Sequence, residues 1–207
     1  MTEKLPATTD GIAAAAAILA EGGLVAFPTD TVYGLGCAVS RPDAIESIYA
    51  IKRRPREKRV AILLGGLRDV DAETWVVDGR ATALADRFWP GALSIVLPSR
   101  IDTDLTQSFR APDHPVAMGL LETAGPMYVT SANVSDEPDT LDADDVLIAF
   151  ATQPDGLAAV VDGDRVPGGT PSTVLDLSVT PARILRPGPV TEAMLAEVVE
   201  LAPAPID

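Results

Sequence analysis

The sequence predicts an α/β fold, and three observations lead to that class. Short apolar runs alternate along the chain with segments of helical periodicity. Hydrophobic residues make up 47% of the 207 residues, which is enough to bury a core. The sequence contains no repeating unit and no stretch long enough to link two domains. We therefore expect residues 1–207 to form a single domain with a flexible tail at residues 202–207.

The first elements are bounded by clear end signals. A helix over Ile12–Ala20 is expected, with Asp10 as its cap and Gly22-Gly23 as its end. Its apolar run is too short to span a bilayer, and the acidic flank is unlike that of a signal peptide. Leu24–Phe27 is an apolar strand that leads into the turn Pro28–Thr31. We accordingly expect a cytoplasmic protein without a membrane segment.

The next helix and strand follow the same logic. Ser40 is the expected cap of a helix that runs to about Lys52, because Pro55 cannot continue it. Val60–Leu64 has the composition of a buried strand and is closed by Gly65-Gly66. The later elements are assigned by alternation of apolar runs and helical patterns: helices 81–89, 116–123, 143–152 and 191–201, and strands 93–97, 126–130, 158–161, 172–177 and 182–185.

A dense cation cluster interrupts an otherwise acidic chain. The formal net charge is −14, yet six of the sixteen basic residues fall within eight positions. They are Lys52, Arg53, Arg54, Arg56, Lys58 and Arg59. Mutual repulsion makes such a cluster costly without an anion, so it suggests a small anionic ligand rather than a broad nucleic-acid surface. Cations at a helix end are also favourable with the helix dipole, so a solvated helix end is the alternative interpretation.

Lys52 and Arg54 are the strongest candidates within the cluster. If the chain is extended there, their side chains point the same way and can clamp a polyphosphate. We expect both to be exposed in a cavity. Two polar turns follow buried strands and could add ligand contacts: Thr29-Asp30-Thr31 and Thr130-Ser131-Ala132-Asn133. Each of them could equally be an ordinary turn.

Several site types are excluded. Cys37 is the only cysteine and His114 the only histidine, which rules out a disulfide framework and a His-rich zinc site. There is no Walker A motif, and Gly34-Leu35-Gly36 lacks the third glycine of a dinucleotide fingerprint. Ser131 is not in a nucleophile elbow, and His114 between prolines is interpreted as a structural loop residue.

At these residues the chain resembles the YrdC-type threonylcarbamoyl-AMP synthases, in their short single-domain form. The matching motifs occur in family order within residues 22–190: Pro28-Thr29-Asp30-Thr31-Val32-Tyr33-Gly34-Leu35, Ile51-Lys52-Arg53-Arg54-Pro55, Arg110-Ala111-Pro112-Asp113-His114-Pro115, Thr130-Ser131-Ala132-Asn133, Pro171-Ser172-Thr173-Val174 and Arg186-Pro187-Gly188. The resemblance implies a single twisted mixed sheet with flanking helices around a basic concave cavity.

The resemblance also implies the activity. Threonine's amine combines with bicarbonate, and the carbamate attacks the α-phosphorus of ATP to give threonylcarbamoyl-AMP and pyrophosphate. A separate transferase complex then modifies adenosine 37 of tRNA to t6A. Mg²⁺ is expected to arrive with ATP, with no protein side chain assigned to it. Binding of tRNA to this chain is expected to be weak or absent.

Site residues carry over from the motifs one by one. The family's Lys-x-Arg and Ser-x-Asn residues fall on Lys52, Arg54, Ser131 and Asn133, which are the expected catalytic residues. By resemblance, threonine is contacted by Thr31, Arg110, Ser131 and Ser172. ATP is contacted by Lys52, Arg54, Lys58, Asn133 and Arg186.

Other positions depart from the family pattern. Arg59, Ala92, Ser94 and Asp136 replace the usual Pro, Pro, Thr and Gly, and Leu63 stands where some longer members have His. An inactive paralogue is therefore one alternative function. A non-enzymatic RNA-binding module of the same fold is another, because a basic concavity suits RNA. A related carbamoyl-adenylate enzyme of hydrogenase maturation would normally need zinc fingers, which one cysteine cannot supply.

Overall fold

The structure of the chain is a computed structural model that describes residues 2–153 and 156–203. It divides into two compact units, each built from two separate stretches of sequence. Unit 1 comprises residues 1–63 and 114–169, and unit 2 comprises residues 64–113 and 170–207. The expectation of a single domain over residues 1–207 stays a prediction.

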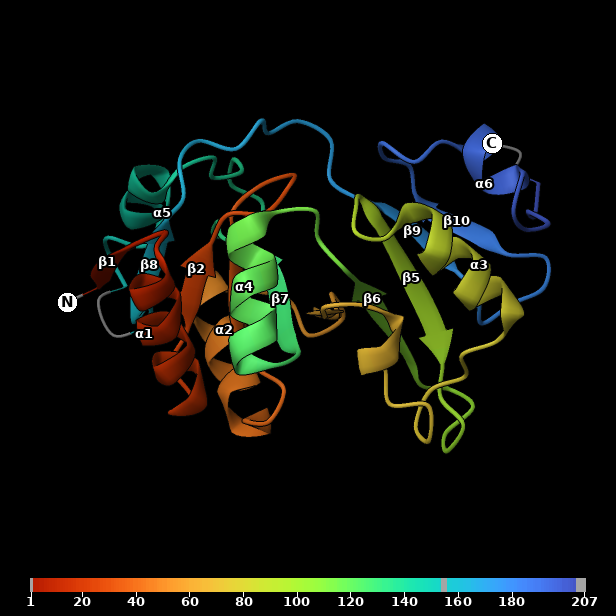
Figure 1. The fold of residues 1–207 in the computed structure, drawn as a ribbon, viewed down its shortest axis with the longest axis horizontal. Coiled ribbons are helices and arrows are strands. Elements are labelled where there is room, and N and C mark those ends of the chain that lie inside the picture. The colour runs from red at the N-terminus through yellow and green to blue at the C-terminus, as the bar shows by residue number, and fades with distance from the viewer. Residues whose placement is uncertain (1, 154–155, 204–207) are drawn as a thin grey trace. The chain divides into compact units, whose positions relative to one another are not determined.

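Unit 1 is a mixed sheet covered by helices (Figure 1). Its elements are β1 (Glu3–Pro6), α1 (Thr9–Ala20), β2 (Val25–Phe27), β3 (Gly34–Ala38), α2 (Ile45–Lys52), β4 (Ala61–Leu63), α4 (Pro115–Ala124), β7 (Met127–Ser131), α5 (Ala143–Ala149) and β8 (Ala159–Asp162). The strand order is β1-β8-β2-β3-β7-β4. β8 pairs parallel with β1 and β2, and the other neighbours are antiparallel.

Alternate residues along strand β2 of unit 1 belong to two different apolar clusters. Val25 and Phe27 of β2 belong to a cluster with α1 and α4, which lie side by side (Figure 1). Ala26, between them, belongs to a second cluster with α2 and α5. Successive strand residues point to opposite faces, so helices cover both faces of this sheet. The predicted α/β class with a mixed sheet and flanking helices is confirmed.

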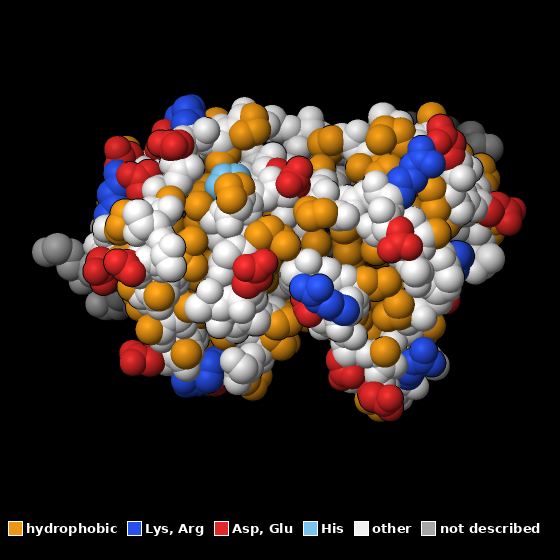
Figure 2. Space-filling model, viewed as in Figure 1, with side chains coloured by type: hydrophobic (Ala, Val, Ile, Leu, Met, Phe, Trp, Pro, Cys, Tyr) orange, Lys and Arg blue, Asp and Glu red, His pale blue; other side chains and the backbone are white. Residues whose placement is uncertain are grey.

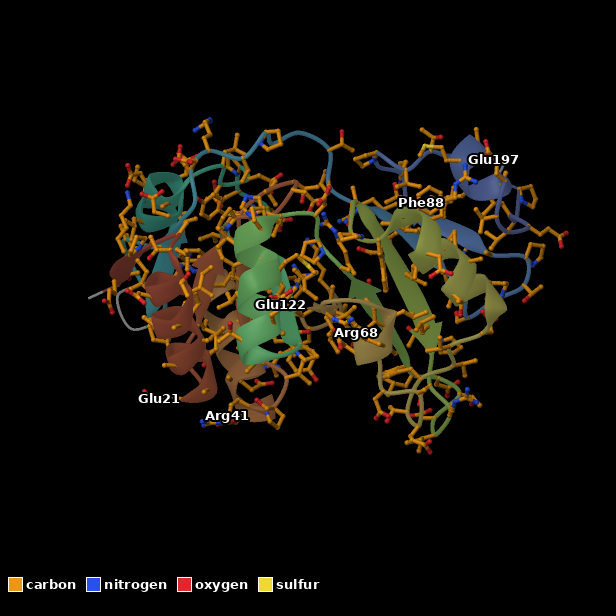
Figure 3. The ribbon with its side chains drawn as sticks, in the orientation of Figure 1. Glu21, Arg41, Arg68, Phe88, Glu122 and Glu197 are labelled. Carbon is orange, nitrogen blue, oxygen red and sulfur yellow. The ribbon has the colours of Figure 1, made fainter. Side chains whose placement is uncertain are left out.

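The described part of unit 2 contains four paired strands and two α-helices. Its elements are α3 (Gly79–Phe88), β5 (Leu93–Pro98), β6 (Thr106–Arg110), β9 (Thr173–Asp176), β10 (Arg183–Arg186) and α6 (Glu192–Ala196). The strand order is β6-β5-β9-β10, with β5 and β9 parallel and the outer pairs antiparallel. Arg87 of α3 forms an ion pair with Glu197 at the end of α6, and its guanidinium lies over the ring of Phe88 (Figure 3).

Strand β3 is the main element that the sequence did not predict. Gly34 and Gly36 gave this segment the composition of a turn, yet all five residues of β3 are buried between β2 and β7. A Cβ on Gly34 would lie 2.9 Å from Cγ1 of Val129, and one on Gly36 would lie 3.0 Å from its Cγ2. The glycines therefore serve close packing of β3 on β7 rather than a turn.

Smaller differences concern element ends. Strands β1 and β6 were not predicted, because both are largely polar. The cap of α1 is Thr8 rather than Asp10, with Thr8 Oγ1 accepting from Gly11 N at 3.3 Å. The last helix is shorter than residues 191–201, and the chain after it pairs with unit 2 through Ala202 N and Ala182 O at 2.7 Å. Residues 204–207 of the expected tail lie outside the described residues.

Arg41 closes the end of α1. Its Nη1 donates to the carbonyl of Ala20 at 3.1 Å, next to Glu21 (Figure 3). In the face shown in Figure 2, hydrophobic side chains and a few acidic ones lie over α1 and α4, neither of which contains a lysine or arginine. No helix in the described part of the chain has the length and apolarity to cross a membrane.

Candidate functional site

Lys52 is the last residue of α2, and its side chain turns inward. Its Nζ donates to the carbonyl oxygens of Ser131 and Asn133, and lies 3.2 Å from Asn133 Oδ1. Only 1% of the residue is exposed. The expectation of an exposed Lys52 is wrong, because the loop after β7 surrounds the ammonium with oxygen acceptors that satisfy its donors.

The helix end that carries Lys52 is a tight left-handed cap. Arg53 adopts φ 52°, ψ 39°, and the amide of Arg54 donates to Tyr49 O at 3.0 Å. This is a Schellman-type ending, in which glycine is the usual residue at the left-handed position. The extended conformation assumed for Lys52 and Arg54 is therefore wrong.

Arg54 and Lys58 belong to one folded loop after this cap. Arg54 is half-buried, and its Nε and Nη2 donate to the carbonyl oxygens of Lys58 and Arg59 at 2.7 and 2.9 Å. Lys58 Nζ forms an ion pair of 2.9 Å with Asp136 Oδ1, on the loop that follows Asn133. The two loops are thus joined beside the predicted catalytic residues.

The rest of the cluster is also engaged within the protein. Arg56 forms a two-point ion pair with Glu46, with 2.6 Å between Nη1 and Oε1, and stacks on Tyr49 at 4.6 Å from the ring centroid. Glu46, in the first turn of α2, was not predicted as a partner of Arg56. The sequence suggested that an anionic ligand is needed to offset the repulsion among these cations. In the structure, carbonyl oxygens and the carboxylates of Glu46 and Asp136 offset it.

Ser131 and Asn133 are brought together with Lys52. Ser131 ends β7, and its Oγ donates to Asn133 Oδ1 at 2.6 Å. Asn133 Nδ2 donates to the carbonyl of Glu137 at 2.6 Å. The amide of Ser135 donates to the carbonyl of Lys52 at 3.0 Å. Each predicted catalytic side chain on this loop is therefore fixed by a hydrogen bond, which is the preorganisation that electrostatic catalysis requires.

Burial and a neighbouring charge act on Lys52. Burial lowers its pKa to about 7, the charge of Arg54 contributes to the lowering, and Asp139 opposes it. Burial likewise lowers the pKa of Arg54, while the charge of Asp136 acts to raise it. A lysine with a pKa near neutrality, close to hydroxyl and amide groups, is typical of a functional site.

Thr31 lies in the turn between β2 and β3. Thr29 Oγ1 donates to Val32 O at 2.7 Å, and the hydroxyls of Thr29 and Thr31 are 3.2 Å apart. Both threonines are buried. The same part of the chain runs beside the Ser131–Asn133 loop, because Ala132 N donates to Tyr33 O at 2.7 Å. Thr29 thus shapes the turn that presents Thr31.

Three predicted residues belong to unit 2. Arg186 donates from Nε to Ser172 O at 3.0 Å and from Nη2 to Ser172 Oγ at 3.2 Å. The hydroxyls of Ser172 and Ser94 are 2.9 Å apart, and both residues are buried. Arg110 is also buried, and its Nε donates to Gly91 O at 2.9 Å. Ser94 was noted in the sequence only as a replacement of the family's usual Thr and was not among the predicted site residues.

Other reactive groups have structural roles. His114 Nδ1 caps α4 by accepting from Val116 N at 3.3 Å, in agreement with its interpretation as a structural residue. Burial raises the pKa of the Cys37 thiol to about 12, so it is not a nucleophile at neutral pH. In residues 2–153 and 156–203, no three His, Cys, Asp or Glu side chains cluster in a way that could hold a metal ion.

A pocket of about 430 Å³ in unit 1 is lined by residues of the loop after Asn133 and of α5. Arg53, Glu137 and Ile148 are among its lining residues, whereas none of the predicted site residues lines it. The pocket therefore differs from the Lys52–Asn133 constellation.

The chain is similar to a family model and to several known proteins. A family model named for Sua5, YciO and YrdC, and described as "Telomere recombination", matches residues 17–188. Threonylcarbamoyl-AMP synthase of Bacillus subtilis is 36% identical over 209 residues, covering 96% of this chain and 59% of that protein. A Mycobacterium tuberculosis H37Rv protein, provisionally named as the same synthase, is 37% identical over 196 residues, covering 91% of this chain and 88% of its own length.

A solved structure extends the comparison to the fold. Sua5 of P. abyssi, in a complex with L-threonine, is similar with a TM-score of 0.85 and 33% identity over 99% of this chain and 63% of that one. This chain therefore spans less than two thirds of the Bacillus and P. abyssi relatives. The match over most of its length shows that the chain belongs to the Sua5/YciO/YrdC family.

Proposed function

We propose that this protein is an L-threonylcarbamoyladenylate synthase. It combines L-threonine, bicarbonate and ATP into threonylcarbamoyl-AMP and pyrophosphate, for t6A modification of tRNA. The observation that carries the proposal is the Lys52–Ser131–Asn133 constellation beside Arg54 and Lys58. The proposal is supported by relatives that are named threonylcarbamoyl-AMP synthase, and by the similar structure of P. abyssi Sua5 in complex with L-threonine.

The chemistry needs charge neutralisation more than a general base. Threonine's amine and bicarbonate form a carbamate with loss of water. A carbamate oxygen then attacks the α-phosphorus of ATP, and the bond to the β-phosphate oxygen breaks to release pyrophosphate. Negative charge grows on the leaving pyrophosphate, where fixed cations and amide donors stabilise it.

Within unit 1 the residues divide between the substrates. Lys52 and Arg54 neutralise phosphate charge, and Lys58 and Asn133 also contact ATP. Thr31 and Ser131 contact threonine through their hydroxyls. From unit 2, Arg110 and Ser172 are proposed for threonine and Arg186 for ATP, on the basis of the family motifs alone.

Mg²⁺ is proposed to enter bound to ATP. No protein side chain is assigned to the ion, which would be held mainly by phosphate oxygens and water. Bound there, it would offset triphosphate charge during displacement, while the cations of unit 1 hold the phosphates in register.

The proposed partners and cellular location follow from the proposed activity. Threonylcarbamoyl-AMP would pass to a tRNA threonylcarbamoyl transferase complex in the cytoplasm. Direct tRNA binding would be weak, because the chain carries a net charge of −14 and its clustered cations are confined to residues 52–59 instead of spreading along a face. Tight tRNA binding without pyrophosphate release would instead favour the RNA-binding alternative.

Release of pyrophosphate tests the function. We expect release from ATP only when threonine, bicarbonate and Mg²⁺ are all present. Equal turnover without threonine would contradict the proposal. Binding of ATP and threonine with no turnover under any condition would favour the inactive-paralogue alternative.

A further inference from the structure

Asp136 lies in an unusual backbone conformation beside the proposed ATP-binding cations. Its φ is 67°, in the left-handed region where glycine is the default residue and where aspartate is tolerated better than most side chains. A carboxylate therefore stands at a position where glycine is the default residue.

The backbone around Asp136 is fixed on both sides. The amide of Ser135 donates to Lys52 O at 3.0 Å, and the carbonyl of Glu137 accepts from Asn133 Nδ2 at 2.6 Å. The amide of Glu137 also donates to Val134 O at 3.1 Å, which closes the turn. The location of the carboxylate therefore depends on the same contacts that hold Lys52 and Asn133.

The carboxylate is directed at two cations of the loop after α2. Asp136 Oδ1 is 2.9 Å from Lys58 Nζ. Its charge also acts on the half-buried Arg54, which holds that loop by donating to the carbonyl of Lys58. The side chains of Lys58 and Asp136 are 51% and 78% exposed, so an anion from solvent can reach the pair.

We propose that Asp136 is a positioning residue that occupies Lys58 in place of a phosphate until ATP binds. This inference rests on the proposed function, because it takes Lys58 as a contact of the ATP phosphates. A triphosphate that approaches Lys58 meets the carboxylate as a like charge and displaces it. Asp136 thereby holds the lysine in place in the free protein and weakens the binding of ATP.

The size of the effect follows from the exposure of the pair. Exposed ion pairs contribute about 0.2–1 kcal/mol, which corresponds to about a 1.5- to 5-fold change in an equilibrium constant. The contribution shrinks as salt is added, because exposed charges are screened. A merely structural role of Asp136 would not show this salt dependence.

The test is a binding titration of the whole protein with Mg·ATP, without threonine or bicarbonate. Asp136→Asn keeps the tolerance for the left-handed conformation and removes the charge. We expect it to bind ATP about 1.5- to 5-fold more tightly than the wild type at low salt, with the gain lost at high salt. Inorganic tripolyphosphate should show the same gain, since the base is not involved.

Two further variants make the result specific. In a Lys58→Gln background, Asp136→Asn should change ATP affinity little, because the pair is already broken. Glu46→Gln is the matched control: it removes the carboxylate that pairs with Arg56 and should leave ATP affinity unchanged.

The outcomes separate this inference from the proposed function. If the wild type binds ATP and releases pyrophosphate while Asp136→Asn binds ATP equally or more weakly, the role of Asp136 is wrong and the function stands. An equal gain in the Lys58→Gln background would also overturn it. A wild type that binds no ATP would overturn the function and this inference together.

Discussion

The candidate site residues of unit 1 and unit 2 are held in different ways. In unit 1 they include the cations of residues 52–58, and in unit 2 they include Ser172 and Arg186. In unit 1, Lys52, Arg54 and Lys58 are charges held by carbonyl oxygens and one exposed carboxylate. In unit 2, the hydroxyls of Ser94 and Ser172 pair in a buried setting, with a single guanidinium on them. The first arrangement suits a polyanion, whereas the paired hydroxyls of the second suit a small ligand with hydroxyl and carboxylate groups, next to the guanidinium of Arg186 that is proposed for ATP.

The largest expected effect is that of Lys52→Met. It removes the ammonium from unit 1, so the rate of pyrophosphate release should fall by about 10²–10³-fold. The carbonyl oxygens of Ser131 and Asn133 would lose a donor, so the free energy of unfolding should fall by about 1–3 kcal/mol. Steady-state kinetics and urea unfolding measure the two effects.

Arg56→Ala is the matched control for Lys52→Met. It removes a cation of the same cluster that is paired with Glu46 on the surface. Its rate should stay within about twofold of the wild type, since exposed pairs contribute little. A Lys52→Met protein that is folded and fully active would contradict a catalytic role for the buried ammonium.

A smaller effect is expected from Ser172→Ala in unit 2. It removes one hydroxyl partner from both Ser94 and Arg186, and the KM for threonine should rise about 2- to 10-fold with ATP affinity retained. Ser178→Ala, which removes a hydroxyl bonded to Asp176, is the control and should change neither. A loss of ATP affinity with unchanged KM for threonine would reverse the contrast between the two regions.

The smallest expected effect is on the pH dependence of ATP binding. With a pKa of about 7, Lys52 loses its proton as the pH rises above neutrality. The phosphates favour the protonated form, so ATP affinity should decrease from pH 7.5 to 9 and binding should take up a fraction of a proton. Calorimetry in two buffers of different ionisation enthalpy measures the uptake, which Lys52→Met should abolish.

The predictability of the two regions from sequence also differs. The clustering of cations at residues 52–59 pointed to unit 1 directly, because charge density is visible along the chain. Burial of Lys52 was not predictable, since its acceptors come from the loop after β7, about eighty residues away. Asp136, 78 residues from Lys58, was hidden as a partner for the same reason, whereas Glu46 is only ten residues from Arg56 and was missed despite its proximity in sequence.

Prediction of the strands from the sequence was limited in a similar way. Apolar runs and end signals were sufficient for β2, β5 and β7, which the structure has within one or two residues of the expected bounds. They failed for β3, where Gly34 and Gly36 are needed because Val129 packs against them. The pairing of Ser94 with Ser172 likewise depends on the parallel register of β5 and β9, which no local pattern encodes.

In the proposed reaction, the adenylyl group of ATP is transferred to the carbamate of threonine. Incubation with ATP, threonine, Mg²⁺ and ¹³C-bicarbonate, followed by mass spectrometry, tests it most directly. We predict an adenylate that contains threonine and one labelled carbon, in equal amount to pyrophosphate. Formation of ADP, or of AMP with pyrophosphate but no label-containing adenylate at any time, would contradict the account.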